Sequence, residues 1–171
     1  MNVFLRPVTP ADLGSLHEWN QDETFCRAAG WTPGLIRRAV NASWKRLLAA
    51  PKKDFLRLGI ESDEQLVGYA DLAGIDQTSG SAEFGIAVAP SCNWGRGIGR
   101  AAGLLMLRHG FQMLKLPCVR AEVHAPNLRS LALMRKLGFR QEGVGAEQMY
   151  DGQLAETVQF SLLRGDFEAV R

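Results

Sequence analysis

Apolar residues follow two periods that alternate along this chain of 171 residues. Between positions 33 and 50 they recur at helical spacing, as Leu35, Ile36, Ala39, Val40, Leu47 and Leu48. Thr32-Pro33 precedes this segment, and a capping residue followed by proline is typical of a helix start. Pro51 is expected to end the helix. Thr9-Pro10 gives the same start signal earlier and predicts a helix to about Trp19.

Strand patterns dominate the rest of the chain. The apolar runs 55–60 and 66–72 flank the polar stretch Ser62-Asp63-Glu64 and predict a hairpin. Further strands are expected at 3–8, 82–88, 118–124, 139–144 and 157–163, and helices at 99–114 and 127–137. Asn127 is a favoured N-cap for the last helix, and Gly138 suits a left-handed C-cap. The order βααβββαβαββ predicts an α/β (α+β) chain whose mixed sheet contains one βαβ unit, over 82–124.

The composition is that of an ordinary globular chain, so residues 1–171 are expected to form a single domain. A net charge of +2, from 20 basic and 18 acidic residues, gives no electrostatic case for nucleic acid. The start MNVFLRPVTP lacks the apolar core of a secretion signal, and the run Ala101–Leu107 is too short to span a bilayer. Cys26, Cys92 and Cys118 show neither a disulfide pattern nor a metal pattern. We therefore expect a cytoplasmic protein with no metal and no membrane partner.

A glycine cluster stands out in APSCNWGRGIGRAAGLL, residues 89–105, where Gly95, Gly97 and Gly99 precede an apolar run that suits a helix. Glycines beside a helix N-terminus favour a backbone site for an anion, although a flexible turn explains them as well. No Lys-Ser or Lys-Thr follows, which excludes a P-loop. A dinucleotide fingerprint also fits poorly, because Pro90 and several polar residues separate the glycines from the preceding strand.

Two longer segments decide between these interpretations. GIAVAPSCNWGRGIGRAAGLLM resembles the acetyl-CoA motif of the GNAT N-acetyltransferase family, and HAPNLRSLALMRKLGFRQEG resembles the segment that follows the next strand in that family. The resemblance covers nearly the whole chain, and Trp94 at the start of the glycine motif points to the RimJ/RimL-like branch. It implies a GNAT-like acyl-CoA N-acyltransferase fold: a single three-layer domain with a central mixed, splayed β-sheet flanked by helices. It also implies acetyl-CoA as co-substrate and an amine acceptor, either a small molecule or a peptide N-terminus. Homodimers are common in that branch.

The resemblance assigns cofactor binding to the glycine motif and its surroundings. Backbone N–H groups of the turn would hold the pyrophosphate, and the main chain of Ile86 and Val88 would pair with the pantetheine arm. The residues implied are Ile86, Val88, Trp94, Gly95, Arg96, Gly97, Ile98, Gly99, Arg100, Asn127 and Ser130. Plain alternatives exist for some of them, because Arg96 and Arg100 also suit a solvated surface, Trp94 a packing role and Asn127 a helix cap alone.

Acetyl transfer to an amine needs a base, because an alkyl ammonium group has a pKa of about 10.4 and arrives protonated. Glu83, on the strand that leads to Ile86, is the candidate; a solvent-facing strand acid is the alternative interpretation. Many family members carry a tyrosine acid seven residues after the asparagine, and this chain has Met134 there. Tyr150 is a substitute candidate for the acid, although MYDGQ also suits a hairpin turn with a surface tyrosine.

Further features of the sequence concern the loop, the acceptor region, the function and the histidines. Trp94 stands four positions after Pro90, where the family has three, and this predicts a bulged loop. In the acceptor region, Asp22 and Glu23 suit an ammonium substrate, although acids at a helix end are the plainer interpretation. Met134 leaves a catalytically silent acyl-CoA-binding module as the alternative function. The histidines, His124 among them, show no ligand spacing and are expected to be structural or on the surface.

Overall fold

A seven-stranded mixed sheet runs through the protein in the order β1-β2-β3-β4-β5-β7-β6. The computed structural model describes residues 2–50, 52–76 and 78–169. The strands are β1 (Val3–Arg6), β2 (Phe55–Ser62), β3 (Gln65–Asp76), β4 (Ser81–Val88), β5 (Cys118–His124), β6 (Arg140–Tyr150) and β7 (Gln153–Leu163). All neighbours are antiparallel except β4 and β5, which pair in parallel. The mixed sheet and its βαβ unit are therefore confirmed.

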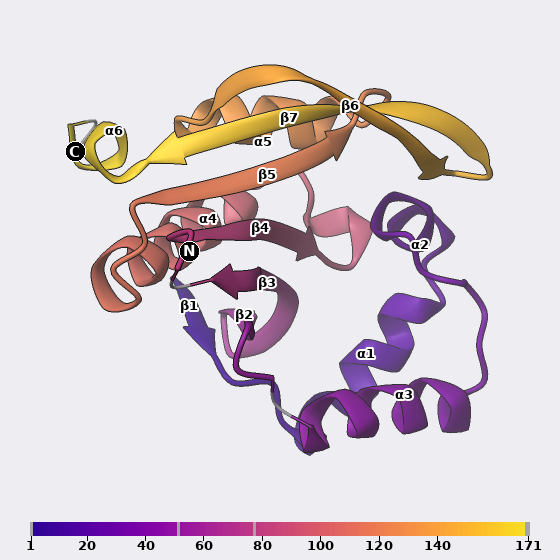
Figure 1. Cartoon of the computed structure of the whole chain (residues 1–171). Coiled ribbons are helices and arrows are strands. Elements are labelled where there is room, and N and C mark those ends of the chain that lie inside the picture. Colours follow the sequence, from indigo (N-terminus) through magenta and orange to yellow (C-terminus); the bar gives the residue numbers. More distant parts are fainter. Residues whose placement is uncertain (1, 51, 77, 170–171) are drawn as a thin grey trace.

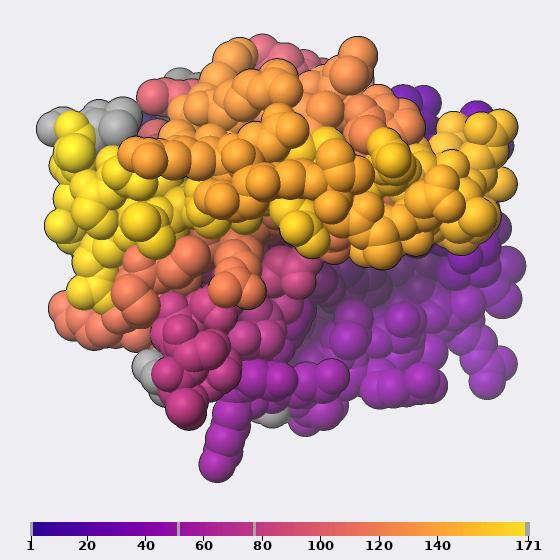
Figure 2. All heavy atoms as spheres, turned by 45° about the horizontal axis from the view of Figure 1, so that its top comes forward, coloured from indigo at the N-terminus to yellow at the C-terminus, as the bar shows by residue number. Residues whose placement is uncertain are grey.

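The α-helices of the described part are α1 (Leu13–Asn20), α2 (Glu23–Ala29), α3 (Arg37–Ala49), α4 (Ile98–Arg108), α5 (Leu128–Leu137) and α6 (Arg164–Ala169). Figure 1 shows α1, α2 and α3 gathered near the C-terminal end of β4, apart from α4 and α5. In the tilted view of Figure 2, the strands β6 and β7 lie above these N-terminal helices, and the surface is recessed where the two parts meet. Among the described residues, no helix has the length and apolar character needed to cross a bilayer.

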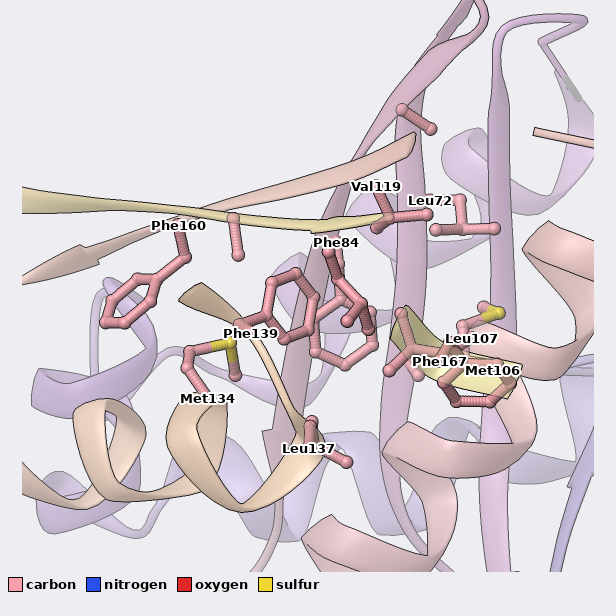
Figure 3. Packing of buried hydrophobic residues seen from close by; sticks show 14 of the residues in the cluster. Leu72, Phe84, Met106, Leu107, Val119, Met134, Leu137, Phe139, Phe160 and Phe167 are labelled. Carbon is pink, nitrogen blue, oxygen red and sulfur yellow. The ribbon is translucent and has the colours of Figure 1, made fainter. Parts of the chain in front are cut away.

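The largest hydrophobic core lies between the sheet and the helices α4 and α5 (Figure 3). Phe84 of β4 packs against Phe139, with ring centroids 5.8 Å apart. Met134 and Leu137 of α5 point into the same core. A second cluster of buried aromatic residues holds the N-terminal helices against β3, and it contains Trp19, Phe25, Trp44 and Tyr69.

The sequence pattern predicts neither α2 nor α6. For α2 the signals are present, because Asp22 caps its first turn by accepting from the Phe25 N–H at 3.0 Å and Gly30 follows in the left-handed conformation. The helix expected from Pro33 begins instead at Arg37. The Asn20 side chain binds the main chain of Thr32 and Leu35, which keeps the preceding segment out of the helix. Pro51, expected to end α3, lies outside the described residues.

Candidate functional site

The strands β4 and β5 separate partway along their length. Their pairing covers only Ser81–Glu83 of β4, opposite Cys118–Arg120. On the other edge, β4 stays paired with β3 up to Val88, and the next N–H, that of Ala89, donates to Val67 of β3. Main-chain groups alternate in direction along a strand, so Ile86 and Val88 direct theirs toward the gap. The splay expected from the resemblance is confirmed.

A cavity of about 340 Å³ opens on this gap, and we call it the glycine-turn cavity. Its walls come from α2, the end of β4, the turn at 93–100 and the first turns of α5. Of the predicted cofactor residues, Ile86, Val88, Trp94, Gly95, Gly97, Ile98, Gly99, Arg100, Asn127 and Ser130 line it. Arg96 does not; its side chain is exposed and donates to Asn93 Oδ1 at 2.8 Å. The interpretation of Arg96 as a surface charge therefore fits the structure better.

The glycine turn presents unused main-chain donors to this cavity. Gly97 is the N-cap of α4 at φ +85°, and Gly95 has φ +79° with no atom within 4 Å of the place where a Cβ would lie. Both angles favour glycine over any other residue. The first N–H groups of α4 have no acceptor within their own helix, and an anion can satisfy them. The turn therefore fits the pyrophosphate of coenzyme A.

Trp94 ties this turn to the sheet. Its indole Nε1 donates to the Val88 carbonyl oxygen at 2.7 Å. The Val88 N–H, which faces the gap as well, is not used by this bond. The Arg129 guanidinium lies 3.6 Å from the centroid of the Trp94 ring, a cation–π contact. Arg129 and Lys136 both line the glycine-turn cavity. The sequence analysis assigned neither cation to the site, although both lie within the quoted motif segment HAPNLRSLALMRKLGFRQEG.

The bulge predicted between Pro90 and Trp94 takes the form of a short turn. Ser91–Asn93 make one 3₁₀ turn, in which Asn93 N–H donates to Pro90 at 2.9 Å and Trp94 N–H to Ser91 at 3.0 Å. The additional residue is absorbed there, before the glycines begin. Trp94 still reaches the cavity wall, so the cradle keeps its shape.

A second cavity of about 230 Å³ adjoins the first, and we call it the carboxylate cavity. Asp71 of β3 and Glu122 of β5 line it, together with Tyr69 and His124. The two cavities share the lining residues Ala28, Ala29, Ile86, Ala87, Asn127 and Ser130. A molecule in one cavity can therefore contact a molecule in the other beside Ile86.

Asp71 forms an ion pair with an arginine on the neighbouring strand. Arg57 of β2 binds both oxygens of Asp71, at 2.7 Å and 2.5 Å, and its guanidinium lies 4.2 Å from the centroid of the Tyr69 ring. Burial raises the pKa of the Asp71 carboxyl, and the Arg57 guanidinium opposes that rise. Burial also raises the pKa of the Tyr69 hydroxyl, which accepts from Trp31 Nε1 at 3.2 Å. The charge of Asp71 is thus balanced by Arg57.

Glu122 is held by neutral donors instead. Thr157 Oγ1 donates to one of its oxygens, and Gln148 Nε2 donates to the other at 3.0 Å. Gly145 of β6 leaves room for this arrangement, because a Cβ there would lie 2.4 Å from both Glu122 Oε1 and Thr157 Oγ1. Sequence reasoning missed Glu122 as a site residue, since only the pairing of β5, β6 and β7 brings these groups together.

His124 and Tyr150 stack beside the carboxylate cavity, with ring centroids 4.8 Å apart. His124 lines the cavity, and its Nε2 is buried with no hydrogen-bond partner among the described residues. Tyr150, predicted as a substitute acid, thus lies next to the cavity through His124 without lining it. Its catalytic role stays a prediction.

The structure separates the other predicted residues. Glu83 is exposed, directly opposite Arg120 in the ladder, and lines neither cavity, so its role as the base stays a prediction. Asp22 caps α2, and Glu23 is exposed beside Arg27 at 3.8 Å. Met134 is buried and lines the carboxylate cavity. In the described part of the chain, no cluster of His, Cys, Asp or Glu side chains is arranged to hold a metal ion.

Comparisons with known proteins agree with this geometry. A model of the acetyltransferase (GNAT) domain family matches residues 2–140. The chain is 25% identical over 169 residues to the spermidine N(1)-acetyltransferase of Escherichia coli strain K12, covering 98% of this chain and 89% of that protein. The match to the uncharacterized N-acetyltransferase p20 of Bacillus licheniformis, at 28% identity, covers 63% of this chain and 61% of that protein.

The fold also matches a solved structure closely. The spermidine N-acetyltransferase from Vibrio cholerae, in complex with CoA and spermine, superposes with a TM-score of 0.82 at 22% identity, over 97% of this chain and 98% of that one. The splayed sheet, the glycine turn and the family match together define an acetyl-CoA-dependent N-acetyltransferase. The chain belongs to the GNAT acetyltransferase family.

Proposed function

We propose that this chain transfers the acetyl group of acetyl-CoA directly to a primary amine, in a ternary complex that spans both cavities. The observation that carries the proposal is the strip of lining residues that the two cavities share, at the point where β4 and β5 have separated. A thioester held along Ile86 and Val88 lies next to a cavity with two carboxylates. The acceptors that suit this geometry are a protein N-terminus, an amino acid, a polyamine or another small amine.

The glycine-turn cavity supplies the groups that hold acetyl-CoA. The N–H groups of the turn and the first turn of α4 bind the pyrophosphate, and Arg100, Arg129 and Lys136 add positive charge around it. The Val88 N–H, on the side of the gap, is a donor for the thioester carbonyl. Such a donor stabilises the negative charge that develops on that oxygen during attack.

The carboxylate cavity supplies the groups that handle protons. An ammonium acceptor must lose one proton before attack and a second one afterwards. We assign proton removal to Glu122, because its partners Thr157 and Gln148 are neutral and no ion pair with it forms among the described residues. Glu83, the base expected from the sequence, is the second candidate. The departing thiolate takes up one proton, from Tyr150 or from water. A thiolate leaves readily, because an alkyl thiol has a pKa of about 8.5.

Two finer assignments extend this proposal. Trp94 in the glycine turn favours the RimJ/RimL-like branch of the family, and a homodimer is expected on the same resemblance. A sedimentation or light-scattering mass of the free protein tests the dimer. Because spermidine acetyltransferases are among the relatives, polyamines should be tested as acceptors together with peptides.

A second function has one observation in its favour. Met134 occupies the position of the family tyrosine and brings a thioether, which cannot donate a proton, into the carboxylate cavity. A catalytically silent acyl-CoA-binding module is the function that this substitution favours. It predicts saturable binding of acetyl-CoA without turnover.

One assay separates the two functions. Release of the CoA thiol from acetyl-CoA is followed with a panel of amines: polyamines, amino acids, aminoglycosides and peptides with free N-termini. Transfer predicts amine-dependent thiol release and an acetylated product by mass spectrometry. Saturable CoA binding with no release for any amine contradicts transfer and leaves the silent module.

A further inference from the structure

The loop before the glycine turn is attached to a distant helix. Ser91 N–H, the first donor of the 3₁₀ turn that absorbs the additional residue, donates to Asp22 Oδ2 at 2.6 Å. Asp22 lies 69 positions earlier in the chain, immediately before α2. This bond therefore joins the loop at 91–94 to the N-terminal helices, across the edge of the glycine-turn cavity.

The other oxygen of Asp22 serves the helix itself. Asp22 Oδ1 accepts from the Phe25 N–H at 3.0 Å, which caps α2. Phe25, Ala28 and Ala29 of that helix line the glycine-turn cavity, and Ala28 and Ala29 also line the carboxylate cavity. One carboxylate thus fixes both the start of the cofactor loop and the helix that borders both cavities.

The Asp22 carboxylate is well suited to accept these two hydrogen bonds. Burial alone would raise the pKa of the Asp22 carboxyl, but the N–H donors of Phe25 and Ser91 outweigh it and hold the pKa below its usual value. Asp22 therefore stays ionised at neutral pH. Hydrogen bonds from N–H groups to a carboxylate are shorter and stronger than those between neutral groups.

We propose that Asp22 is a positioning residue that couples the two cavities. It holds the loop at 91–94, and with it Trp94 and the glycines, at a fixed distance from α2. Ordering of the glycine turn by a bound pyrophosphate is then transmitted through Ser91 and Asp22 to α2, which borders the acceptor's cavity. The inference rests on the proposed role of the glycine turn in binding coenzyme A.

Position 91 offers a matched pair of variants. Ser91→Pro removes only the N–H that reaches Asp22 and the hydroxyl, because proline suits the first position of a helical turn and Pro90, at φ −64° and ψ 174°, has the extended geometry required before a proline. Ser91→Ala removes the hydroxyl and keeps the N–H. Position 91 itself is not among the described residues that line either cavity.

The measurement is hydrogen exchange of the full chain with and without CoA, together with the CoA dissociation constant by calorimetry. In the wild type and in Ser91→Ala, CoA slows exchange both at 95–100 and in α2. In Ser91→Pro, CoA still slows exchange at 95–100, but protection of α2 falls at least about threefold and the dissociation constant rises about threefold to tenfold, as expected for one lost charge-assisted bond.

Asp22→Asn gives an independent reading should Ser91→Pro fold poorly. Asparagine still caps a helix, but its NH2 group replaces one of the two oxygens of Asp22 and faces an N–H group as a second donor. We expect the same loss of α2 protection, with Glu23→Gln, the neighbouring exposed acid, behaving as wild type. Equal α2 protection in Ser91→Pro and Ser91→Ala, or in Asp22→Asn and wild type, overturns the coupling. Absence of any CoA response in the wild type would instead refute the proposed function, and the coupling with it.

Discussion

The two cavities differ in the sign of the charge that lines them. Among the described residues, the glycine-turn cavity has Arg100, Arg129 and Lys136 in its lining and no carboxylate. The described lining of the carboxylate cavity has Asp71 and Glu122 and neither lysine nor arginine. The strip that they share carries no charged side chain. Under the proposed function, this arrangement would direct an anionic donor and a cationic acceptor to opposite sides of the point at which they react.

The two cavities also differ in how their charge is balanced. Among the described residues, the cations of the glycine-turn cavity have no carboxylate partner, and under the proposed function the phosphates of coenzyme A would be their partners; Arg129 also contacts Trp94. In the carboxylate cavity, Asp71 already has Arg57 as a partner, whereas Glu122 has only neutral partners within the described part of the chain. We expect substitutions on the two sides to affect different steps, as set out below from the largest effect to the smallest.

Glu122→Gln is expected to have the largest effect. The amide keeps the shape of the side chain but cannot accept the proton of the amine, so kcat should fall about 100-fold or more. Binding of CoA, measured by calorimetry, should stay within about twofold of wild type, because Glu122 lies outside the glycine-turn cavity.

Glu83→Gln is the matched control for that variant. The Glu83 side chain is exposed and lines neither cavity, so we expect its kcat to fall less than about threefold. The reverse order, with Glu83→Gln the slower enzyme, would assign the base to Glu83 as the sequence predicts and would remove Glu122 from that role.

Arg57→Ala tests the charge balance behind Asp71. The variant leaves a largely buried carboxylate without its cation, and we expect a loss of about 2–4 kcal/mol in the free energy of unfolding near pH 7. Without Arg57, the folded-state pKa of Asp71 should rise further above its unfolded value. Stability gained by the neutral carboxyl is present at low pH and lost as the pH rises through that pKa.

The loss should therefore shrink as the pH is lowered toward about 5, as measured by urea unfolding at both pH values. Arg96→Ala, an exposed arginine outside both cavities, serves as the control and should change stability by less than about 0.5 kcal/mol at either pH. A loss for Arg57→Ala that is independent of pH would show that packing against the aromatic residues, and not the charge of Asp71, accounts for it.

Gly145→Ala should disturb Glu122 without removing it. The added methyl group would overlap Glu122 Oε1 and Thr157 Oγ1, so the carboxylate must move. We expect kcat to fall about tenfold, with little change in CoA affinity. Gly143→Ala on the same strand, where a Cβ would meet no atom within 4 Å, is the control and should keep most of the activity. Equal activities of the two variants would contradict the placement of Glu122.

Arg129→Ala acts on the other cavity and should have the smallest effect. Loss of one cation and of its contact with Trp94 should weaken CoA binding about threefold to tenfold and leave kcat at saturation nearly unchanged. Arg96→Ala, two residues from Trp94 but directed toward Asn93, should bind CoA as wild type does. Similar losses for both variants would indicate a diffuse electrostatic effect rather than a defined lining.

Much of the glycine-turn cavity could be predicted from the sequence because a large part of its lining lies in one contiguous segment, residues 86–100. Gly95 and Gly97 have backbone angles that only glycine readily adopts, and Asn127 caps its own helix, so each leaves a local signature. Arg96 does not line the cavity, since a charge beside a glycine turn carries no sign of where it points, and its role with the cofactor stays a prediction. The missed helix α2 did carry signals, in Asp22 and Gly30.

The carboxylate cavity could not be predicted in the same way. Glu122 becomes a site residue only through the pairing of β5 with β7 and of β7 with β6, and the β6–β7 register shifts twice, between Gln141 and Gly143 and between Gly145 and Gln148. Local sequence does not specify such shifts, because a slip of one residue reverses the face on which every side chain lies. Arg57 and Asp71 likewise meet only across the β2–β3 ladder.

Binding of acetyl-CoA to the wild-type chain is the central claim, and the shift of Tm in a thermal melt measures this binding. At about 100 times the dissociation constant, a ligand of the folded state adds about 2.7 kcal/mol, which for a domain of this size should raise Tm by about 5–10 °C. We predict a rise of that size, dependent on concentration, with acetyl-CoA and with CoA. An unchanged Tm at millimolar acetyl-CoA would contradict the account.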